Sequence, residues 1–336
     1  MKRLLNTLYV TSGNKYLSLD GENVVVLEEQ KEIGRIPLHN LQAIITFGYT
    51  GASPALMGVC AQRNIDLSFM SGNGRFLARV TGEVKGNVTL RKQQYQLSEN
   101  KLGLEISKEL IKCKMKNQKA TLTTLNKNKQ LKRVFNYRSK IDEIIKQIDE
   151  LSLNGDNEKQ RIKIMGLEGK ASNEYWMGVK YFIPKEIEFR NRTKQPTDLL
   201  NSMLNYGYAI LASEITKSIL VNGLDPYCGF LHFDMDRRTS LTFDLIEPFR
   251  QQIVDKTVIS LINRKQITND DLDKRNNTIK LEARKLIVSK ILGKIFSTIT
   301  YNDETVSYAD LIRKQSKNLV DTLLNGTEFN GFYLRW

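Results

Sequence analysis

Residues 36–63, IPLHNLQAIITFGYTGASPALMGVCAQR, contain both of the patterns that decide the fold of this chain. Their first half is rich in β-branched and apolar residues and predicts a strand. Their second half, from Ser53 to Arg63, predicts a helix, with Ser53 as the N-cap and Pro54 at the first helical position. Five other short segments in the neighbourhood also favour strands: LLNTLYV, KYLSL, NVVVLEE, DLSFMS and RFLARV. Six strands with one small helix predict a compact β-sandwich.

The pattern changes after about residue 90, where longer segments carry apolar residues at helical spacing. The expected helices cover residues 97–127, 138–152, 158–181, 197–221, 243–263, 279–299 and 306–325. We therefore predict an α+β, multidomain protein. Residues 1–88 would form the small β-sandwich domain, and residues 89–336 would form a larger all-α domain.

The charge of the chain favours a polyanionic partner. Its 51 Lys and Arg residues exceed its 37 Asp and Glu residues, which gives a net charge of +14. Nucleic acid is the most common partner of such a protein. Lys112 and Lys116 belong to KCKMKNQK, the centre of a strongly basic stretch, and are candidates for contacts with phosphate groups. The alternative is a solvated face of a helix.

Other features of the composition indicate a cytoplasmic protein without membrane association. No apolar run approaches the roughly 18 residues that a membrane span requires. The first residues lack the long apolar region of a signal peptide. The three cysteines are widely spaced, which fits a reducing compartment and predicts neither a disulfide framework nor a zinc ribbon.

A second stretch, residues 229–250 (GFLHFDMDRRTSLTFDLIEPFR), suggests a metal site. It contains His232, one of only two histidines in the chain, and two carboxylates three positions apart, Asp244 and Glu247. Because Pro248 is tolerated only in the first turn of a helix, we expect a helix to begin at 242–248, with its amides favouring the charged carboxylates. Imidazole and carboxylate ligands suit Mg²⁺ or Mn²⁺. The alternative is a structural histidine, with Asp244 capping the helix.

A third stretch, IMGLEGKASNEYW (164–176), places Glu168 inside an expected helix with Gly166 and Gly169 beside it. Glycine costs roughly 1 kcal/mol in a helix interior. Its presence on both sides of Glu168 predicts a close approach of another backbone, which bulky residues would block. Tight packing between helices is the alternative explanation.

Four blocks of the chain together resemble the CRISPR adaptation integrase family, the CRISPR-associated endonuclease Cas1. They are LEG with Glu168, LNYGYAIL (204–211), GLDPYCGFLH ending at His232, and FDLIEPFR (243–250). Their order and spacing match the family, the segment from Ile36 to Arg79 resembles its β domain, and the closing YLRW resembles one branch. The resemblance covers nearly the whole chain, and the length and the FDLIEPFR block suggest a type I system.

The resemblance implies an N-terminal β-sandwich that helps to pair protomers into a homodimer, and a helical catalytic domain. It implies DNA as the partner, both as a foreign-derived duplex and as the CRISPR repeat. It also implies the small partner protein Cas2, with two Cas1 dimers in the integration complex. The implied reaction is transesterification, in which a 3′-hydroxyl attacks a phosphodiester at the repeat boundary. Cleavage of DNA with Mg²⁺ or Mn²⁺ is implied as well.

The resemblance also assigns site residues. The implied metal ligands are Glu168, His232 and Glu247, the last of which is often Asp in relatives. Asp244 is implied as a further catalytic residue that supports the metal or the DNA. Arg250 and Tyr206 fall on positions near the DNA.

Two other functions remain open from the sequence. One is a stand-alone metal-dependent DNA nuclease or transposon-type integrase with the same fold. The other is a non-catalytic DNA-binding scaffold. The three-ligand set implied by the resemblance argues against the scaffold, because binding alone requires no such site.

Overall fold

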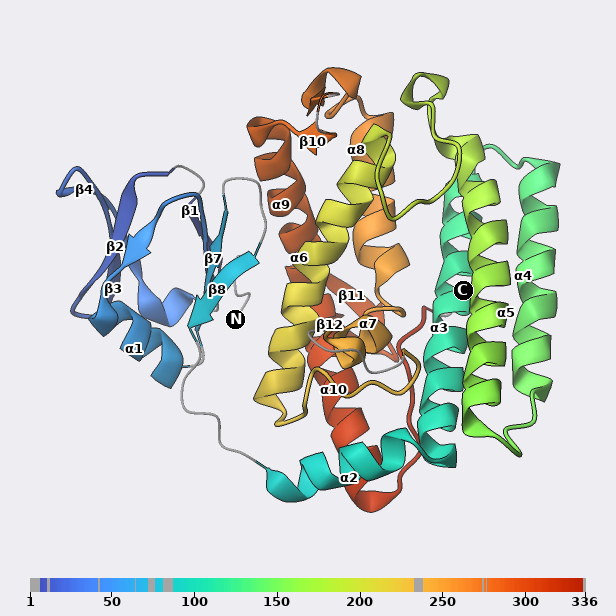
Figure 1. Ribbon diagram of the computed structural model, residues 1–336. Helices are drawn as coiled ribbons and strands as arrows, with labels where there is room; N and C mark the ends of the chain where they lie inside the picture. Colours follow the sequence, from blue (N-terminus) through green and yellow to red (C-terminus); the bar gives the residue numbers. More distant parts are fainter. Residues whose placement is uncertain are drawn as a thin grey trace. The chain divides into compact units, whose positions relative to one another are not determined.

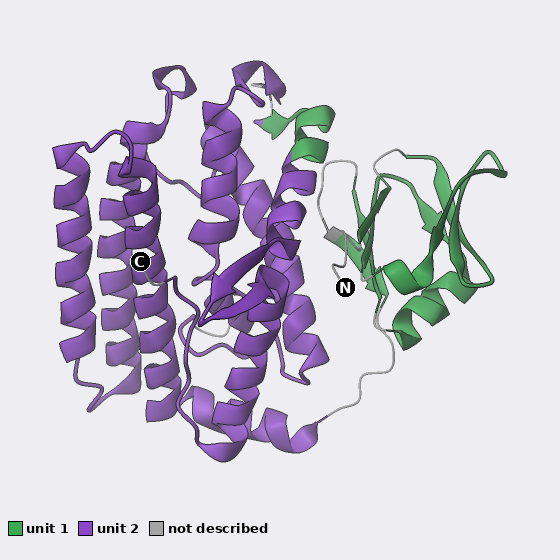
Figure 2. Ribbon diagram, turned by 180° about the vertical axis from the view of Figure 1, so that it is seen from behind, with its two compact units in different colours: residues 1–85, 278–286 green, residues 86–277, 287–336 purple. Residues whose placement is uncertain are grey.

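The computed structural model divides the chain into two compact units (Figure 2). The first unit comprises residues 1–85 and 278–286, and the second comprises residues 86–277 and 287–336. The structure describes residues 7–10, 13–41, 43–63, 65–71, 76–80, 87–232, 238–273, 275 and 277–334. None of the helices in these ranges could serve as a membrane span, because none combines sufficient length with sufficient hydropathy.

Two four-stranded sheets make up most of the first unit (Figure 1). In one sheet, of order β1-β5-β7-β8, the first three strands are parallel and β8 is antiparallel to β7. Its strands are β1 (Thr7–Val10), β5 (Ala43–Phe47), β7 (Asp66–Met70) and β8 (Phe76–Val80). The other sheet, of order β4-β3-β2-β6, is an antiparallel meander with a parallel edge strand. Its strands are β2 (Lys15–Asp20), β3 (Asn23–Glu28), β4 (Lys31–Pro37) and β6 (Gly51–Ala52).

One apolar core joins both sheets to helix α1 (Pro54–Gln62). Leu17 of β2, Ile44 of β5 and Leu56 of α1 are all fully buried in it. As predicted, Ser53 caps α1, and its hydroxyl accepts a hydrogen bond from the backbone N–H of Leu56 at 3.2 Å. The sandwich predicted from the sequence is therefore confirmed.

The described residues between 7 and 80 contain eight strands rather than six. The run IPLHNLQAIITFG was expected to form one strand, but it contains the end of β4, a 3₁₀ turn (Leu38–Asn40) and β5. Pro37 explains the break, because proline has no N–H to donate to a continuing ladder. The two-residue strand β6 is too short to produce a recognisable sequence pattern.

The second unit is mainly helical. Its longer helices are α2 (Val88–Ser98), α3 (Lys101–Asn126), α4 (Lys132–Glu150), α5 (Asn157–Val179), α6 (Leu199–Val221) and α10 (Tyr308–Asn325); α9 (Leu281–Phe296) begins in the segment grouped with the first unit. Helices α3, α4 and α5 pack side by side (Figure 1). Asp156 caps α5, and its carboxylate accepts a hydrogen bond from the N–H of Lys159 at 2.9 Å. These long helices form the scaffold from which the candidate site is built.

The expected helix over residues 243–263 is interrupted. The chain forms α7 (Ser240–Leu245), a turn, a π-helical segment (Gln251–Asp255) and α8 (Lys256–Asn263). Pro248 lies in the turn, where its missing N–H cannot continue the helical hydrogen bonding. The turn carries Glu247 toward α3, which a continuous helix would not do.

The predicted all-α domain, residues 89–336, is not strictly all-α, because the structure contains two short two-stranded sheets after α8. They are β9 (Leu272–Asp273) with β10 (Thr278–Ile279), and β11 (Thr298–Tyr301) with β12 (Glu304–Ser307). Asn302 and Asp303 link the second pair with φ angles of 49° and 64°. Asn and Asp tolerate this conformation, which a two-residue hairpin turn requires.

Candidate active site

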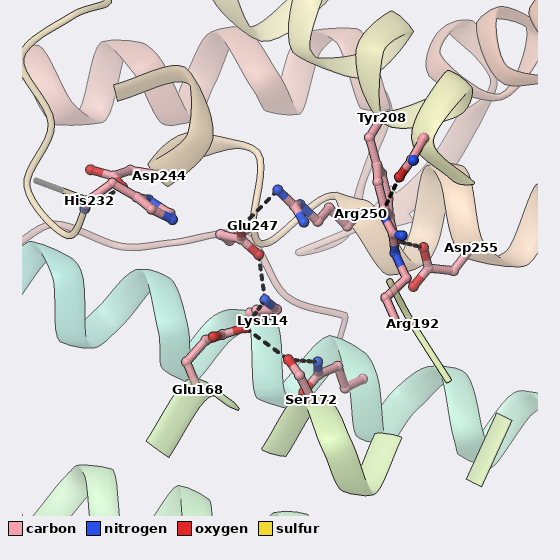
Figure 3. Close-up of polar contacts among 12 residues, drawn as sticks. Lys114, Glu168, Ser172, Arg192, Tyr208, His232, Asp244, Glu247, Arg250 and Asp255 are labelled. Atoms are coloured by element: carbon pink, nitrogen blue, oxygen red, sulfur yellow. Dashed lines mark hydrogen bonds and ion pairs between the residues drawn. The ribbon is translucent and has the colours of Figure 1, made fainter. Parts of the chain in front are cut away.

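The loop from Gly229 to His232 is held by the carboxylate of Asp244, which lies in α7 and is fully buried (Figure 3). Oδ2 of Asp244 accepts hydrogen bonds from the backbone N–H groups of Phe230 at 2.6 Å and Leu231 at 2.9 Å. Oδ1 accepts one from the N–H of His232 at 3.1 Å. A Cβ on Gly229 would lie 2.9 Å from Oδ2, so the absence of a side chain there permits this approach. Asp244 thus fixes the backbone that carries His232.

The same carboxylate orients the ring of His232. Nδ1 of His232 lies 2.6 Å from Oδ1 of Asp244. Because a carboxylate only accepts, Nδ1 carries the hydrogen, and Nε2 of the neutral ring keeps a lone pair. Histidines that bind metals typically donate their other ring nitrogen to such a partner.

Two sequence-based expectations about Asp244 are wrong. Helix α7 begins after Thr239, so Asp244 lies near its C-terminal end. Asp244 therefore neither caps this helix nor gains from the amides of a helix that begins at 242–248. The N–H groups that hold it come from the 230–232 loop, which the tertiary fold brings to it.

The other two predicted ligands, Glu168 and Glu247, meet at a single cation, the ammonium group of Lys114 (Figure 3). Lys114 comes from α3, Glu168 from α5, and Glu247 from the turn after α7. Nζ of Lys114 lies 2.6 Å from Oε2 of Glu247 and forms a second ion pair with Oε1 of Glu168. The other Glu247 oxygen pairs with Arg250 at 3.0 Å, and Ser172 donates to Oε1 of Glu168 at 2.9 Å. Three separate segments therefore converge on one charged centre.

Lys114 and Glu168 strongly affect each other's pKa, because both groups are largely shielded from water. Burial by itself lowers the pKa of a lysine, but the two carboxylates more than offset this and raise the pKa of Lys114. Burial likewise raises the pKa of Glu168, but the charge of Lys114 and the Ser172 hydrogen bond hold that pKa at about 2. Glu168 is consequently ionised at neutral pH and available as an oxygen ligand.

The carboxylate pair fits a divalent cation, because two ionised oxygen ligands already converge on one positive charge. The complete three-ligand set is not assembled in this conformation. Among the residues that the structure describes, no three His, Cys, Asp or Glu side chains lie close enough together to share an ion. Glu168 and Glu247 are joined through Lys114, whereas His232 is paired with Asp244 (Figure 3).

The predicted close approach at the glycines beside Glu168 is wrong. A Cβ added to Gly166 or to Gly169 would meet no atom within 4 Å. Neither glycine is therefore required by a neighbouring backbone or by tight packing between helices, and nothing in the structure explains them.

A cavity of about 290 Å³ opens beside Glu168. Its lining is mostly polar: Lys114, Gln118, Glu168, Gly169, Ser172, Asn173, Trp176, Asn191, Arg192, Tyr208, Arg250 and Gln251. The guanidinium groups of Arg250 and Arg192 lie 4.7 Å and 5.4 Å from the centre of the Tyr208 ring. Two arginines stacked on one aromatic ring give this cavity a positively charged wall.

Asp255 holds Tyr208, the ring on which the two arginines lie. Its fully buried carboxylate accepts hydrogen bonds from the hydroxyl of Tyr208 at 2.6 Å and from that of Tyr175 at 2.9 Å. Burial raises the pKa of Asp255 to about 6, although the two tyrosine hydrogen bonds oppose the rise. The orientation of the Tyr208 ring, and with it the arginine positions, depends on this buried group.

Arg250 and Tyr206, both predicted to lie near the DNA, differ in their relation to the cavity. Arg250 lines the cavity. Tyr206 does not line it, and the tyrosine that α6 places there is Tyr208.

The two lysines expected to contact phosphate also lie outside the cavity lining. Lys112 pairs with Asp149 at 2.7 Å. Nζ of Lys116 lies 3.9 Å from the centre of the Tyr333 ring. Their contact with DNA stays a prediction.

Sequence reasoning missed Lys114, which it read as one of several lysines on a phosphate-contacting or solvated face. A signal was present, since Lys114, Asn117, Gln118 and Thr121 recur at helical spacing and all are buried. Such a polar stripe on a buried face predicts specific partners, because buried polar groups require them. Nothing in the sequence indicated Ser172, Arg192 or Asp255.

Comparison with known proteins identifies the family. A family model described as CRISPR associated protein Cas1 matches residues 8–291. A CRISPR-associated protein Cas1 of Methanobrevibacter ruminantium is 46% identical over 98% of this chain and 99% of its own length. A CRISPR-associated endonuclease Cas1 of Archaeoglobus fulgidus is 33% identical over 98% of this chain and 99% of its own. The chain therefore belongs to the Cas1 family.

A solved structure supports the fold assignment as well. A casposase bound to integration product superposes with a TM-score of 0.80 at 25% identity, covering 97% of this chain and 93% of the casposase chain. The fold of this chain thus occurs in a casposase whose structure was solved bound to integration product.

Proposed function

We propose that this chain is a metal-dependent DNA endonuclease and integrase that inserts new spacers into a CRISPR array. Membership of the Cas1 family supports the reaction class, and one structural observation carries the proposal for this site. Two carboxylates from different segments, the half-buried Glu168 and the buried Glu247, converge on a single positive charge beside an arginine-lined cavity. A scaffold that only binds DNA needs no pair of acids held together in this way.

Glu168 and Glu247 would hold Mg²⁺ or Mn²⁺, with Nε2 of His232 as the third ligand. Such an ion neutralises charge on the oxygens of the phosphodiester and positions the attacking 3′-hydroxyl. The remaining work is done by the chain itself. Asp244 holds the tautomer in which Nε2 of His232 can accept or ligate.

The arginines supply the attraction for the substrate. Arg250 and Arg192 present planar guanidinium groups at the cavity wall, and such groups bind phosphate oxygens in a forked geometry. Arg250 also pairs with Glu247, so the same side chain links the phosphate position to the carboxylate. The basic charge of the whole chain adds attraction that weakens with salt.

The partners proposed with this function are a foreign-derived DNA duplex, the CRISPR repeat and the small protein Cas2. The assembly proposed is a homodimer, with two dimers in the integration complex. The assignment to a type I system stays a prediction.

A joining assay tests the proposal. A short duplex with free 3′-hydroxyls is incubated with a supercoiled plasmid carrying a CRISPR repeat, with Cas2, and with or without Mn²⁺ or Mg²⁺. Joining that requires the ion and is lost in His232→Ala supports the integrase. Loss of DNA binding together with activity in a folded His232→Ala protein would show that His232 is not a metal ligand.

The casposase similarity favours one second candidate, a transposon-type integrase that acts without Cas2. The same assay separates the two functions. Integration at the repeat that depends on Cas2 supports CRISPR adaptation. Joining into plasmids with or without a repeat, at equal rates and without Cas2, supports the transposon-type enzyme.

A further inference from the structure

We propose that Lys114 is the internal counter-ion of the metal site, which holds the two glutamates together before the divalent ion binds and is displaced by that ion. This inference rests on the proposed metal dependence, and it assigns a role to a residue that neither the sequence patterns nor the family resemblance singled out. Lys114 is a positioning residue here, because it acts through the carboxylates.

The location of Lys114 makes it a direct competitor. Its ammonium group forms ion pairs with Oε1 of Glu168 and Oε2 of Glu247, so it occupies the space between the oxygens that a divalent ion would share. The side chain is only 8% exposed, which leaves little water to screen the interaction. A second cation cannot enter between the same two oxygens while the ammonium remains.

The formal charges support the same conclusion. Glu168 and Glu247 contribute two negative charges, and Lys114 and Arg250 contribute two positive ones, so the described cluster is neutral without a metal. Adding a divalent ion to a neutral buried cluster is unfavourable. Moving the Lys114 ammonium away reduces the excess positive charge at the moment the ion arrives.

The surroundings give the displaced group a place to go. Lys114 itself lines the cavity of about 290 Å³. A lysine side chain has four flexible methylene groups, so its ammonium can swing into that space while its backbone stays in α3.

The decisive experiment measures metal binding in the absence of DNA. Mn²⁺ is titrated into wild type, Lys114→Met and Lys119→Met, and the free ion is followed by electron paramagnetic resonance. Lys119→Met is the matched control, because it removes a lysine of the same helix that is also ion-paired, with Asp142 at 2.6 Å. We expect the Kd of Lys114→Met to fall at least roughly tenfold, since a unit positive charge next to the ion is removed. The Kd of Lys119→Met should stay within about twofold of wild type, because exposed pairs are well screened.

The outcomes separate this inference from the proposed function. If wild type and both variants fail to bind Mn²⁺, the proposed metal dependence is wrong. If wild type binds Mn²⁺ and Lys114→Met binds it equally or more weakly, Lys114 supports the metal rather than competing with it, and the inference is wrong.

A measurement on the wild type covers the case in which Lys114→Met does not fold. Lysines are labelled by reductive methylation with and without saturating Mg²⁺, and peptide masses give the labelling rate of Lys114 relative to Lys119. An ammonium held between two carboxylates is shielded from the reagent, so displacement by Mg²⁺ should raise the relative rate at least twofold. An unchanged rate with Mg²⁺ bound would refute displacement.

Discussion

Replacing Asp244 by asparagine should damage both stability and the histidine ligand, and the structure sets the size of the effect. Each carboxylate oxygen of Asp244 accepts two hydrogen bonds, one oxygen from two backbone N–H groups and the other from the N–H and Nδ1 of His232. The side-chain amide of asparagine has the shape of the Asp244 carboxylate but only one acceptor oxygen. Whichever way it turns, its NH₂ group faces two donors. At about 1.5–3 kcal/mol for each bond to a charged acceptor, the loss is about 3–6 kcal/mol.

Two measurements check this prediction. Denaturation in urea gives the free energy of unfolding, and ¹⁵N spectra of labelled histidine report which ring nitrogen carries the hydrogen. The spectra are simple because the chain contains only two histidines. Asp142→Asn is the control, since Asp142 pairs with Lys119 on the surface, and such pairs contribute at most about 1 kcal/mol.

The result that would refute this reasoning is specific. A loss below about 1 kcal/mol in Asp244→Asn, with hydrogen still on Nδ1 of His232, would mean that the carboxylate does not hold the loop or the ring as described. A loss similar to that of Asp142→Asn would lead to the same conclusion.

Three further variants test other parts of the site. Glu247→Gln should weaken Mn²⁺ binding at least roughly tenfold and abolish DNA joining, because one of the two carboxylates that meet Lys114 loses its charge. Unchanged Mn²⁺ binding would exclude Glu247 as a ligand. Asn117→Ala should lower the free energy of unfolding by about 1–3 kcal/mol, because the Asn117 side chain donates a hydrogen bond to the buried carbonyl of Pro248 at 2.7 Å. A thermal melt that matches wild type would contradict this. Burial raises the pKa of Asp255 from 3.8 to about 6, so its contribution to stability is present at low pH and is lost as pH rises through that window. Relative to wild type, Asp255→Asn should therefore gain about 2 kcal/mol between pH 4 and pH 7, and parallel pH profiles of the two proteins would contradict this.

Much of the architecture could be predicted from local sequence patterns. The cap predicted at Ser53 was correct because capping depends on a few adjacent residues. The change from short alternating segments to long helical ones correctly separated a sandwich from a helical unit. The errors lie where local patterns are ambiguous. One expected strand is broken at Pro37, and one expected helix is broken near Pro248.

The candidate site was only partly predictable. Sequence blocks pointed to Glu168, His232, Asp244 and Glu247, but they did not show how these residues are grouped. They indicated a carboxylate pair, Asp244 with Glu247, whereas the structure pairs Asp244 with His232 and joins Glu247 to Glu168. Three positions of separation put two residues on one face only if a regular helix runs between them, and α7 ends between Asp244 and Glu247.

The sequence by itself determined the elements, the excess of positive charge and the types of residue available for chemistry, because these follow from neighbouring residues and from composition. The tertiary structure alone decided that Lys114 meets Glu168 and Glu247, and that Tyr208 rather than Tyr206 lies at the cavity with Arg250. Those contacts join segments far apart in the chain. Their geometry is set by how whole helices pack, and the energy of each buried charge depends on which partner that packing brings to it.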